Sequence, residues 1–218
     1  MVAMILAAGR GERLRPITDT VPKALVEVGG ISLLERQLQR LADANSETVV
    51  INLGWFGEQI AERIGSGQQF GLQVVYSPEY DNILDTGGGI KRALPVIGNA
   101  PFWVINADVY TDMALPNVKL DAASIAHLVL VPTPAHKESG DFELRNGKVR
   151  NCNNQDLTFS GIAFYRPEFF AESDEGRFSV VPLLRAAADR GQLDGSLYEG
   201  TWEDVGTPER LEALNKNN

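Results

Sequence analysis

The stretch that decides the fold lies at the start of the chain, where residues 2–25 read VAMILAAGRGERLRPITDTVPKAL. The apolar run at 2–6 is typical of a buried parallel strand, and a turn with Gly9 and Gly11 follows it. Several cations come next, namely Arg10, Arg13, Arg15 and Lys23. Backbone N–H groups beside glycines, together with fixed positive charges, suit a polyphosphate. The stretch therefore predicts nucleotide chemistry at the end of the first strand.

Two better-known phosphate motifs do not fit this turn. No Gly-Lys-Ser/Thr follows at the P-loop offset, and Leu14 stands where the third glycine of a dinucleotide fingerprint would fall. The alternative is an ordinary strand-to-helix turn with exposed arginines. Against that alternative, Lys23 follows Pro22, whose ring helps to fix the direction in which the lysine leaves the chain.

Strand and helix signals alternate through the rest of the first half. Apolar patterning predicts strands at 48–53, 73–76 and 102–106, and helices at 33–44, 58–64 and 89–94, the last one stopped by Pro95. In the second half we expect strands at 126–131, 159–165 and 202–204, a hairpin turning at Asn146-Gly147, and helices at 180–190 and from Pro208. This rhythm predicts a single α/β domain whose sheet binds ligands at the carboxyl ends of its strands.

Composition narrows the function classes. A net charge of −9 over 218 residues argues against nucleic acid or a membrane surface as partner. No apolar stretch reaches the roughly 18 residues needed to span a bilayer, and the start of the chain does not have the pattern of a secretory signal. Cys152 is the single cysteine of the sequence, which excludes an internal disulfide and favours a reducing, cytoplasmic compartment.

Two aspartates follow predicted strands. Asp108 comes just after 102–106, and Asp204 ends the strand at 202–204. Each alone suits ordinary turn or cap chemistry. Together with a cationic loop they suit Mg²⁺, which binds one or two carboxylates plus substrate phosphates. Glu203 is the weaker candidate because side chains alternate along a strand.

Small polar segments beside other strands suit a sugar or a base. These segments are Thr86–Gly89, Ser139–Asp141 and Thr158–Gly161, and each is weak by itself because flexible turns have the same composition. His127 lies in an apolar run and fits the core, whereas His136 lies in a loop. Neither belongs to a Ser/His/Asp or Cys/His arrangement.

Residues 6–25 resemble the signature of the sugar-1-phosphate nucleotidyltransferases. The segments 84–89 (LDTGGG), 106–108 (NAD) and 202–208 (WEDVGTP) are similar to further motifs of that family, so the resemblance covers nearly the whole chain. It implies a Rossmann-like, GT-A-like single domain with a mixed, mainly parallel sheet and a small β-hairpin portion over the sugar site. Residues 1–112 would form the nucleotide-binding part and 113–218 the sugar-binding part, without a C-terminal β-helix.

The resemblance also implies roles for single residues. Catalysis would rest on Arg13, Lys23, Asp108 and Asp204, with Mg²⁺ held by the two aspartates. The nucleotide would contact Leu6, Ala7, Ala8, Gly9, Gly11, Arg13, Lys23, Glu79, Thr86, Gly87 and Gly88. The sugar would contact Asn106, Gly140, Asp141, Asn153, Ser160 and Gly161. Many members hold the sugar phosphate with the lysine of a Glu-Lys-Pro tripeptide, but residues 151–156 (NCNNQD) contain no lysine.

Within the family, the TGGGI run at 86–90, Gly140–Phe142 and Thr158–Gly161 are most similar to members that transfer a uridylyl group from UTP to N-acetylmuramic acid 1-phosphate in cell-wall recycling. Guanylyl transfer to mannose 1-phosphate and thymidylyl transfer to glucose 1-phosphate stay open. So do two other classes, an NAD(P)-dependent oxidoreductase and a non-catalytic nucleotide-sugar sensor. We expect a monomer or a small homo-oligomer.

Overall fold

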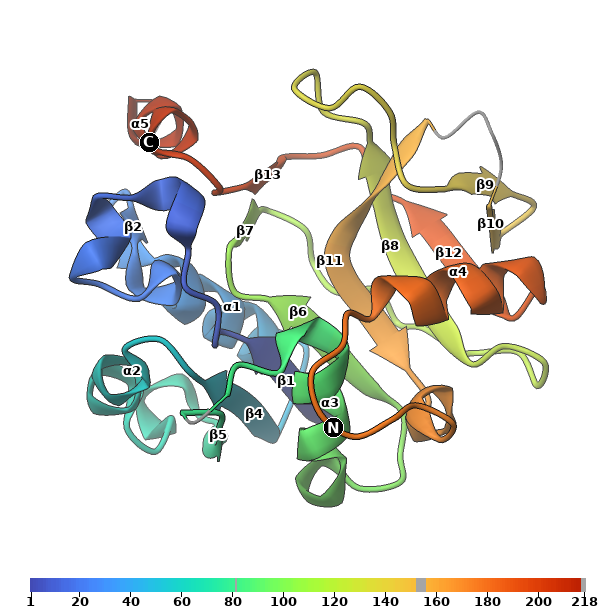
Figure 1. Ribbon diagram of the computed structural model, residues 1–218, viewed down its shortest axis with the longest axis horizontal. Helices are drawn as coiled ribbons and strands as arrows, with labels where there is room; N and C mark the ends of the chain where they lie inside the picture. The colour runs from blue at the N-terminus through green and yellow to red at the C-terminus, as the bar shows by residue number, and fades with distance from the viewer. Residues whose placement is uncertain (81, 152–155, 217–218) are drawn as a thin grey trace.

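A nine-stranded mixed sheet forms the centre of the protein, with helices on both of its faces (Figure 1). The computed structural model describes residues 1–80, 82–151 and 156–216. The strand order is β5-β4-β1-β6-β11-β8-β12-β10-β9, and β11 and β10 run against the other strands of this sheet. The expected α/β fold with a mixed, mostly parallel sheet is confirmed.

The strands of the sheet are β1 (Val2–Leu6), β4 (Thr48–Leu53), β5 (Gln73–Pro78), β6 (Phe102–Asn106), β8 (Ala126–Pro132), β9 (Glu143–Arg145), β10 (Lys148–Arg150), β11 (Leu157–Tyr165) and β12 (Leu193–Leu197). Two short pairs lie outside it: β2 (Glu27–Val28) with β3 (Ile31–Ser32), and β7 (Val109–Thr111) with β13 (Trp202–Asp204). The α-helices are α1 (Leu33–Asp43), α2 (Gly57–Ile64), α3 (Asp85–Ile97), α4 (Val181–Asp189) and α5 (Pro208–Lys216). The 3-10 helices are η1 (Glu12–Leu14), η2 (Ile17–Asp19), η3 (Lys23–Leu25), η4 (Gln68–Phe70) and η5 (Pro167–Phe170).

Each face of the sheet has its own hydrophobic cluster, because strand side chains alternate between the two faces. On one face α1 packs through Leu34, Leu38 and Leu41, and α2 packs through Ile60 and Ile64. On the other face α3 and α4 pack with apolar residues that include Ile90, Ala93, Ile97, Leu184 and Ala187. This arrangement leaves the carboxyl ends of β1, β4 and β6 as an edge of the sheet where ligands can bind.

A third, smaller cluster joins the two ends of the chain. Leu14, Val26 and Leu33 from the first part of the chain pack against Val205 and Leu211 near its end. The side chain of Asn215 adds a hydrogen bond of 2.9 Å from the Gly29 N–H. The helix α5 is thereby held beside the cationic loop of residues 9–25, and Figure 1 shows α5 above β2.

Two expectations about single elements are corrected. The helix predicted at 89–94 begins already at Asp85, so the TGGG run lies inside α3, and Pro95 lies in its last turn, where the Gly98 N–H still bonds the Leu94 carbonyl at 2.9 Å. The hairpin β9–β10 turns at Asn146-Gly147 as predicted, with both residues at positive φ. It extends the far edge of the sheet beside β12, however, because β10 pairs with β12, and its residues line none of the site cavities described below.

Candidate active site

The cationic loop leaves the carboxyl end of β1 and folds back on itself through η1, η2 and η3. Gly11 has φ of 63°, and the Thr18 hydroxyl donates to its carbonyl at 2.9 Å. A Cβ on Gly11 would lie 3.0 Å from the Cβ of Lys23, so the glycine leaves room for that lysine. A Cβ on Gly9 would meet no atom within 4 Å, which keeps the backbone at Gly9 open to a ligand.

Lys23 and Asp108 form the centre of the site. The Lys23 Nζ lies 2.5 Å from Asp108 Oδ2, and only 15% of the lysine side chain is exposed. Asp108 follows β6, which lies beside β1 in the sheet, so the aspartate comes from the neighbouring strand end. The loop and the first predicted acid therefore converge.

Pairing of β13 with β7 brings in Asp204. Asp204 lies opposite Val109, and the Val205 N–H donates to the Asp108 carbonyl at 2.9 Å. Asp204 Oδ2 lies 3.9 Å from an Arg13 nitrogen, which connects the second acid to the cationic loop. The expected convergence of loop, Asp108 and Asp204 is therefore present in the structure.

Three basic side chains surround the Asp204 carboxylate. Besides Arg13, Arg210 on α5 donates to Oδ1 at 2.5 Å and to the Asp204 carbonyl at 3.1 Å. His136 Nε2 lies 3.7 Å from Oδ1. Glu203 points instead to Arg210 Nε at 3.5 Å, and burial raises the pKa of its carboxyl while Arg210 acts in the opposite direction. Arg210 therefore contacts both Glu203 and Asp204, and the weaker place of Glu203 as a metal ligand stays a prediction.

The donor set fits a magnesium ion that is completed by substrate. In the described residues no group of three or more His, Cys, Asp or Glu side chains is arranged to hold a metal. Asp108 and Asp204 supply hard carboxylate oxygens from two adjacent short strands, and Mg²⁺ commonly takes its remaining ligands from water and phosphates. Asp108 and Asp204 are therefore the residues that would hold it.

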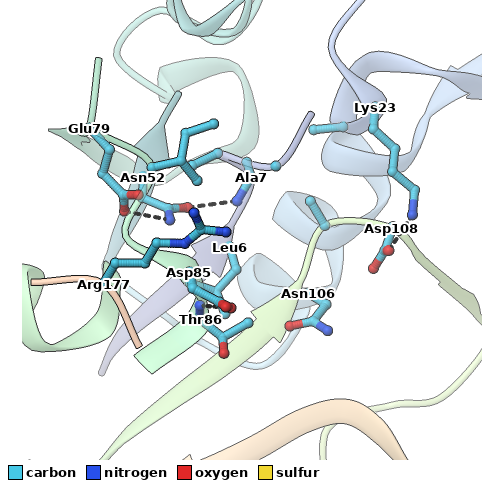
Figure 2. A pocket seen from close by; sticks show the side chains of 15 residues that line it. Leu6, Ala7, Lys23, Asn52, Glu79, Asp85, Thr86, Asn106, Asp108 and Arg177 are labelled. Carbon is cyan, nitrogen blue, oxygen red and sulfur yellow. Dashed lines mark hydrogen bonds and ion pairs between the residues drawn. The ribbon is translucent and has the colours of Figure 1, made fainter. Parts of the chain in front are cut away.

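A deep cavity of about 270 Å³ begins beside Asp108 and is shown in Figure 2, and Asp204 is not among the residues that line it. Its wall away from Lys23 holds Asn52 and Glu79, both almost fully buried. Asn52 accepts the Ala7 N–H at 2.6 Å and donates to Glu79 at 2.9 Å, and Glu79 also accepts the Leu84 N–H at 2.9 Å. These bonds fix a buried carboxylate at the cavity wall, where it can accept a hydrogen bond from a base.

A wider cavity of about 930 Å³ lies over the cationic loop. It shares Gly9, Lys23, Asp108 and Arg177 with the deep cavity and extends to Trp55. The Arg10 guanidinium lies 5.4 Å from the Trp55 ring centre. The two cavities together offer a base-sized recess that opens into a cationic trough, the outline of a nucleoside triphosphate site.

Most of the predicted nucleotide residues line one or both cavities: Leu6, Ala7, Ala8, Gly9, Gly11, Arg13, Lys23, Glu79 and Thr86. Gly87 and Gly88 have a different surrounding. A Cβ on Gly87 would lie 2.3 Å from the Phe178 ring, and one on Gly88 would lie 2.1 Å from the Gly176 carbonyl. Both glycines are buried and allow residues 176–178 to pack on α3, so neither lines the cavities.

The residues predicted to contact the sugar also differ in their surroundings. Asn106 and Gly161 lie together, since a Cβ on Gly161 would meet the Asn106 amide at 2.7 Å. Asp141, next to Gly140, accepts the Phe159 N–H at 3.0 Å and lies 3.4 Å from Lys137. Ser160 is a correction, because its buried hydroxyl donates to the Val129 carbonyl at 2.7 Å and faces the sheet interior. Asn153 lies outside the described residues.

Sequence reasoning missed three residues of this site, Asn52, Arg177 and Arg210, and gave His136 only as a loop residue that could touch substrate. Asn52 carried a usable signal, because it is a polar residue near the carboxyl end of the apolar strand β4. Arg210 lies in the first turn of α5, and Asp204 lies six residues before it at the end of β13. His136 and Arg177 come from loops, where the local sequence pattern does not predict the direction in which a side chain points. His127 bonds Ser196 at 2.9 Å within β8 and β12, away from the site.

A family model described as nucleotidyl transferase matches residues 2–148 of the chain. The chain belongs to the nucleotidyl transferase family. The matched segment contains the cationic loop, Glu79, the TGGG run and Asp108, and stops before Asp204. The oxidoreductase and sensor alternatives are not favoured, and the expected enzyme class is confirmed.

Two curated members of this nucleotidyl transferase family are similar over nearly their whole length. One, named N-acetylmuramate alpha-1-phosphate uridylyltransferase, from Neisseria meningitidis serogroup B, is 44% identical and covers 97% of this chain and 95% of its own. Another protein of the same name, from Caulobacter vibrioides, is 35% identical and covers 95% of this chain and 93% of its own.

Solved structures support the fold of this family member. A putative glucose-1-phosphate thymidylyltransferase from Bacillus anthracis superimposes with a TM-score of 0.87 at 22% identity, covering 100% of this chain and 95% of that one. At this identity the match shows the fold alone. In the described part of the chain, no helix has the length and apolar character to cross a membrane.

Proposed function

We propose that this nucleotidyltransferase transfers a uridylyl group from UTP to N-acetylmuramic acid 1-phosphate and releases pyrophosphate. One observation carries the chemistry: the acid pair Asp108 and Asp204 meets the cationic loop through the Lys23 and Arg13 contacts. The two curated relatives, similar along nearly their whole length, support this choice of donor and acceptor. The single cysteine supports a cytoplasmic location.

The reaction is an in-line displacement at the α-phosphorus. An oxygen of the sugar phosphate forms the new P–O bond, and the bond to the β-phosphate oxygen breaks, so pyrophosphate leaves with the electron pair. No covalent enzyme intermediate is needed, because the nucleophile is already an anion. The protein supplies position and charge neutralisation.

Each charged residue has a place in that scheme. Lys23 is largely buried between loop and acid, where its ammonium group can contact the α-phosphate and the incoming phosphate as charge shifts between them. Arg13 is mostly exposed at the outer cavity and suits the departing pyrophosphate. Asp108 and Asp204 would hold Mg²⁺, which neutralises phosphate charge when bound. The sugar phosphate, without a Glu-Lys-Pro lysine, would rely on Lys23 and this metal.

The base end of the deep cavity offers a hydrogen-bond acceptor to the base. The buried Glu79 side chain lies at one wall of this cavity of about 270 Å³ and already accepts the Leu84 N–H. The N3–H of uracil is a donor that suits such an acceptor, and the choice of UTP over other triphosphates rests on the two curated relatives. Ala8 and Gly9 border the same cavity and offer backbone contacts to the nucleoside.

The test is a matrix of UTP, dTTP, GTP and CTP against sugar 1-phosphates, scored by pyrophosphate release. The sugars are N-acetylmuramic acid, N-acetylglucosamine, glucose and mannose 1-phosphate. We expect the highest kcat/KM for UTP with N-acetylmuramic acid 1-phosphate. A higher value for GTP with mannose 1-phosphate, or for dTTP with glucose 1-phosphate, would replace the proposed pair by that one.

A further inference from the structure

The short strand β7, which directly follows Asp108, has one backbone edge that no other strand covers. Within the described part of the chain, β7 pairs with β13 alone, so only one of its two edges belongs to a ladder. At the start of that ladder the Asp108 carbonyl accepts the Val205 N–H at 2.9 Å. Successive carbonyls of a strand point to opposite edges, so those of residues 109 and 111 point away from β13. An uncovered edge of this kind leaves backbone groups in need of partners.

Two side chains of α1 bond to that second edge. The Gln37 amide donates from Nε2 to the Val109 carbonyl, and the Arg40 guanidinium donates from Nη2 to the Thr111 carbonyl. Arg40 Nε also donates to the Met113 carbonyl at 2.7 Å. The two side chains are three residues apart on α1 and lie on the same face of the helix. They therefore take the place that a neighbouring strand would have beside β7.

The same two side chains also fix each other. Arg40 donates from Nη1 to the Gln37 Oε1 at 2.5 Å, so both ends of the Gln37 carboxamide are bonded. Gln37 is fully buried, and the other buried residues of α1 are all leucines. A glutamine on this apolar face is unfavourable unless its polar atoms have partners. Packing alone does not explain a glutamine at this position, whereas its contact with β7 does.

The Val109 backbone lies between the two acids of the site. Val109 follows Asp108 in the chain and lies opposite Asp204 in the β7–β13 register. The hydrogen bond from Gln37 therefore ends on the backbone that carries one carboxylate and is paired with the backbone that carries the other. Mg²⁺ demands nearly ideal octahedral geometry with short bonds, so a small displacement of either carboxylate weakens its binding.

We infer that Gln37 and Arg40 are positioning residues for the proposed metal site. They hold the uncovered edge of β7 against α1 and thereby fix the separation of Asp108 and Asp204. Neither side chain has to touch substrate for this role. The inference rests on the proposed function for the part that the two acids play in catalysis.

The first test removes the hydrogen bonds of Gln37. Gln37→Met keeps a long unbranched side chain of similar volume but leaves the Val109 carbonyl without its partner. Mn²⁺ affinity in the presence of UTP, followed by electron paramagnetic resonance, should fall by about 10-fold. Gln39→Met is the matched control, because Gln39 is exposed on the same helix and bonds the Asp43 side chain at 2.9 Å. It should leave the Mn²⁺ affinity unchanged.

The second test separates positioning from the stability of α1. Ser32→Ala removes the capping residue of the same helix and should lower stability without changing the Mn²⁺ affinity. Arg40→Lys keeps the charge and a donor, so it should lose less affinity than Arg40→Met, and this pair provides the comparison if Gln37→Met does not fold. An equal loss of affinity in Ser32→Ala and Gln37→Met would indicate general loosening of α1 and would overturn the inference.

Hydrogen exchange tests the same contact without a metal or a substrate. The Val205 N–H, which bonds the Asp108 carbonyl, should exchange faster in Gln37→Met than in the wild type, whereas amides of β4 should keep their rate. An unchanged exchange rate at Val205, or an unchanged Mn²⁺ affinity, would overturn the inference. If the wild type releases no pyrophosphate with any sugar phosphate while both differences are present, the proposed function fails and the positioning role stands.

Discussion

Lys23 and Lys148 form ion pairs of almost equal length but in different surroundings. The Lys23–Asp108 distance is 2.5 Å and the Lys148–Asp194 distance is 2.6 Å. Lys23 lines both nucleotide cavities, whereas Lys148 lies on β10 near the sheet edge. An ion pair that serves structure alone should affect stability and not turnover, so the two pairs offer an internal comparison.

Removal of the Lys23 ammonium group should lower kcat by at least about 100-fold, the scale of one preorganised electrostatic group. Steady-state kinetics of Lys23→Ala measure it, with Lys148→Ala as the control that keeps the wild-type kcat. A rise in KM with an unchanged kcat would mean that Lys23 binds phosphate without stabilising the transition state.

Asp108→Asn keeps the shape of the side chain and removes its charge. We expect turnover to fall by at least about 100-fold and Mn²⁺ binding, followed by electron paramagnetic resonance, to weaken. Asp194→Asn, in the comparison pair, should change neither. A near-wild-type rate of Asp108→Asn at saturating Mg²⁺ would remove Asp108 from the metal site.

Arg210 holds the second acid through both its carboxylate and its carbonyl. Arg210→Gln should therefore raise the Mg²⁺ concentration needed for half-maximal rate, because Asp204 loses its orientation, and Mn²⁺ affinity should fall with it. Arg190→Gln is a suitable control, since Arg190, within the described part of the chain, bonds the nearby Gln192 side chain and the helix backbone. Equal metal dependence in both variants would show that Asp204 needs no such support.

At the scale of single elements, the helix α1 has a capping box at its amino-terminal end. Ser32 caps the helix, accepting the Glu35 N–H at 3.2 Å, and Glu35 bonds back to the Ser32 N–H at 3.1 Å. Loss of this cap in Ser32→Ala should cost about 1 kcal/mol of unfolding free energy, measured by urea titration. No loss would mean that the tertiary contacts of α1 make the cap redundant.

The same capping box predicts a pH dependence. Burial acts to raise the Glu35 pKa, but hydrogen bonds from Arg63 and Ser32 outweigh it and hold that pKa below the ordinary 4.5. The ionised carboxylate therefore stabilises the folded state above its unfolded pKa, and this contribution disappears as pH falls through the lower folded value. The stability difference between wild type and Glu35→Gln should be largest near neutral pH and shrink below pH 4.5.

Local patterning predicted the elements whose sequence is apolar and continuous. β1, β4 and β6 have the predicted bounds because each is a run of buried residues. The start of α3 was missed since consecutive glycines disfavour a helix by roughly 1 kcal/mol each. The packing of residues 176–178 against α3 outweighs this helix propensity, because that packing leaves no room for a Cβ at Gly87 or Gly88. β12 (LDGSL) is neither apolar nor alternating and gave no signal.

At the scale of the whole molecule, the third hydrophobic cluster connects α5 to the cationic loop. Leu211 is its contribution from α5, and Leu14 lies in the loop itself. Leu211→Ala should lower the unfolding free energy by about 2 kcal/mol or more and also raise the Mg²⁺ requirement, because Arg210 and Asp204 move with α5. Leu184→Ala, in the cluster under α4, should lower stability without altering that requirement. Equal Mg²⁺ requirements in the two variants would contradict this connection.

The candidate site was predictable where strand ends carry charge. Asp108 follows β6, and Arg13 and Lys23 follow the neighbouring parallel strand β1, so the sheet brings these three to one edge, and the pairing of β13 with β7 adds Asp204. Arg177 and His136 were not predictable, because their positions depend on how loops pack over α3 and over Asp204. Contacts that arise only after distant segments meet leave no local pattern in the sequence.

The order in which the acids enter the site has a consequence for synthesis. The loop, Asp108 and β7 leave the ribosome long before Asp204, which joins them only when β13 pairs with β7. A growing polypeptide that has reached α4 already contains every residue that lines the deep cavity, yet it has half of the carboxylate pair. If the two carboxylates hold Mg²⁺ as proposed, the nascent chain gains its complete metal site only after β13 has emerged and paired with β7.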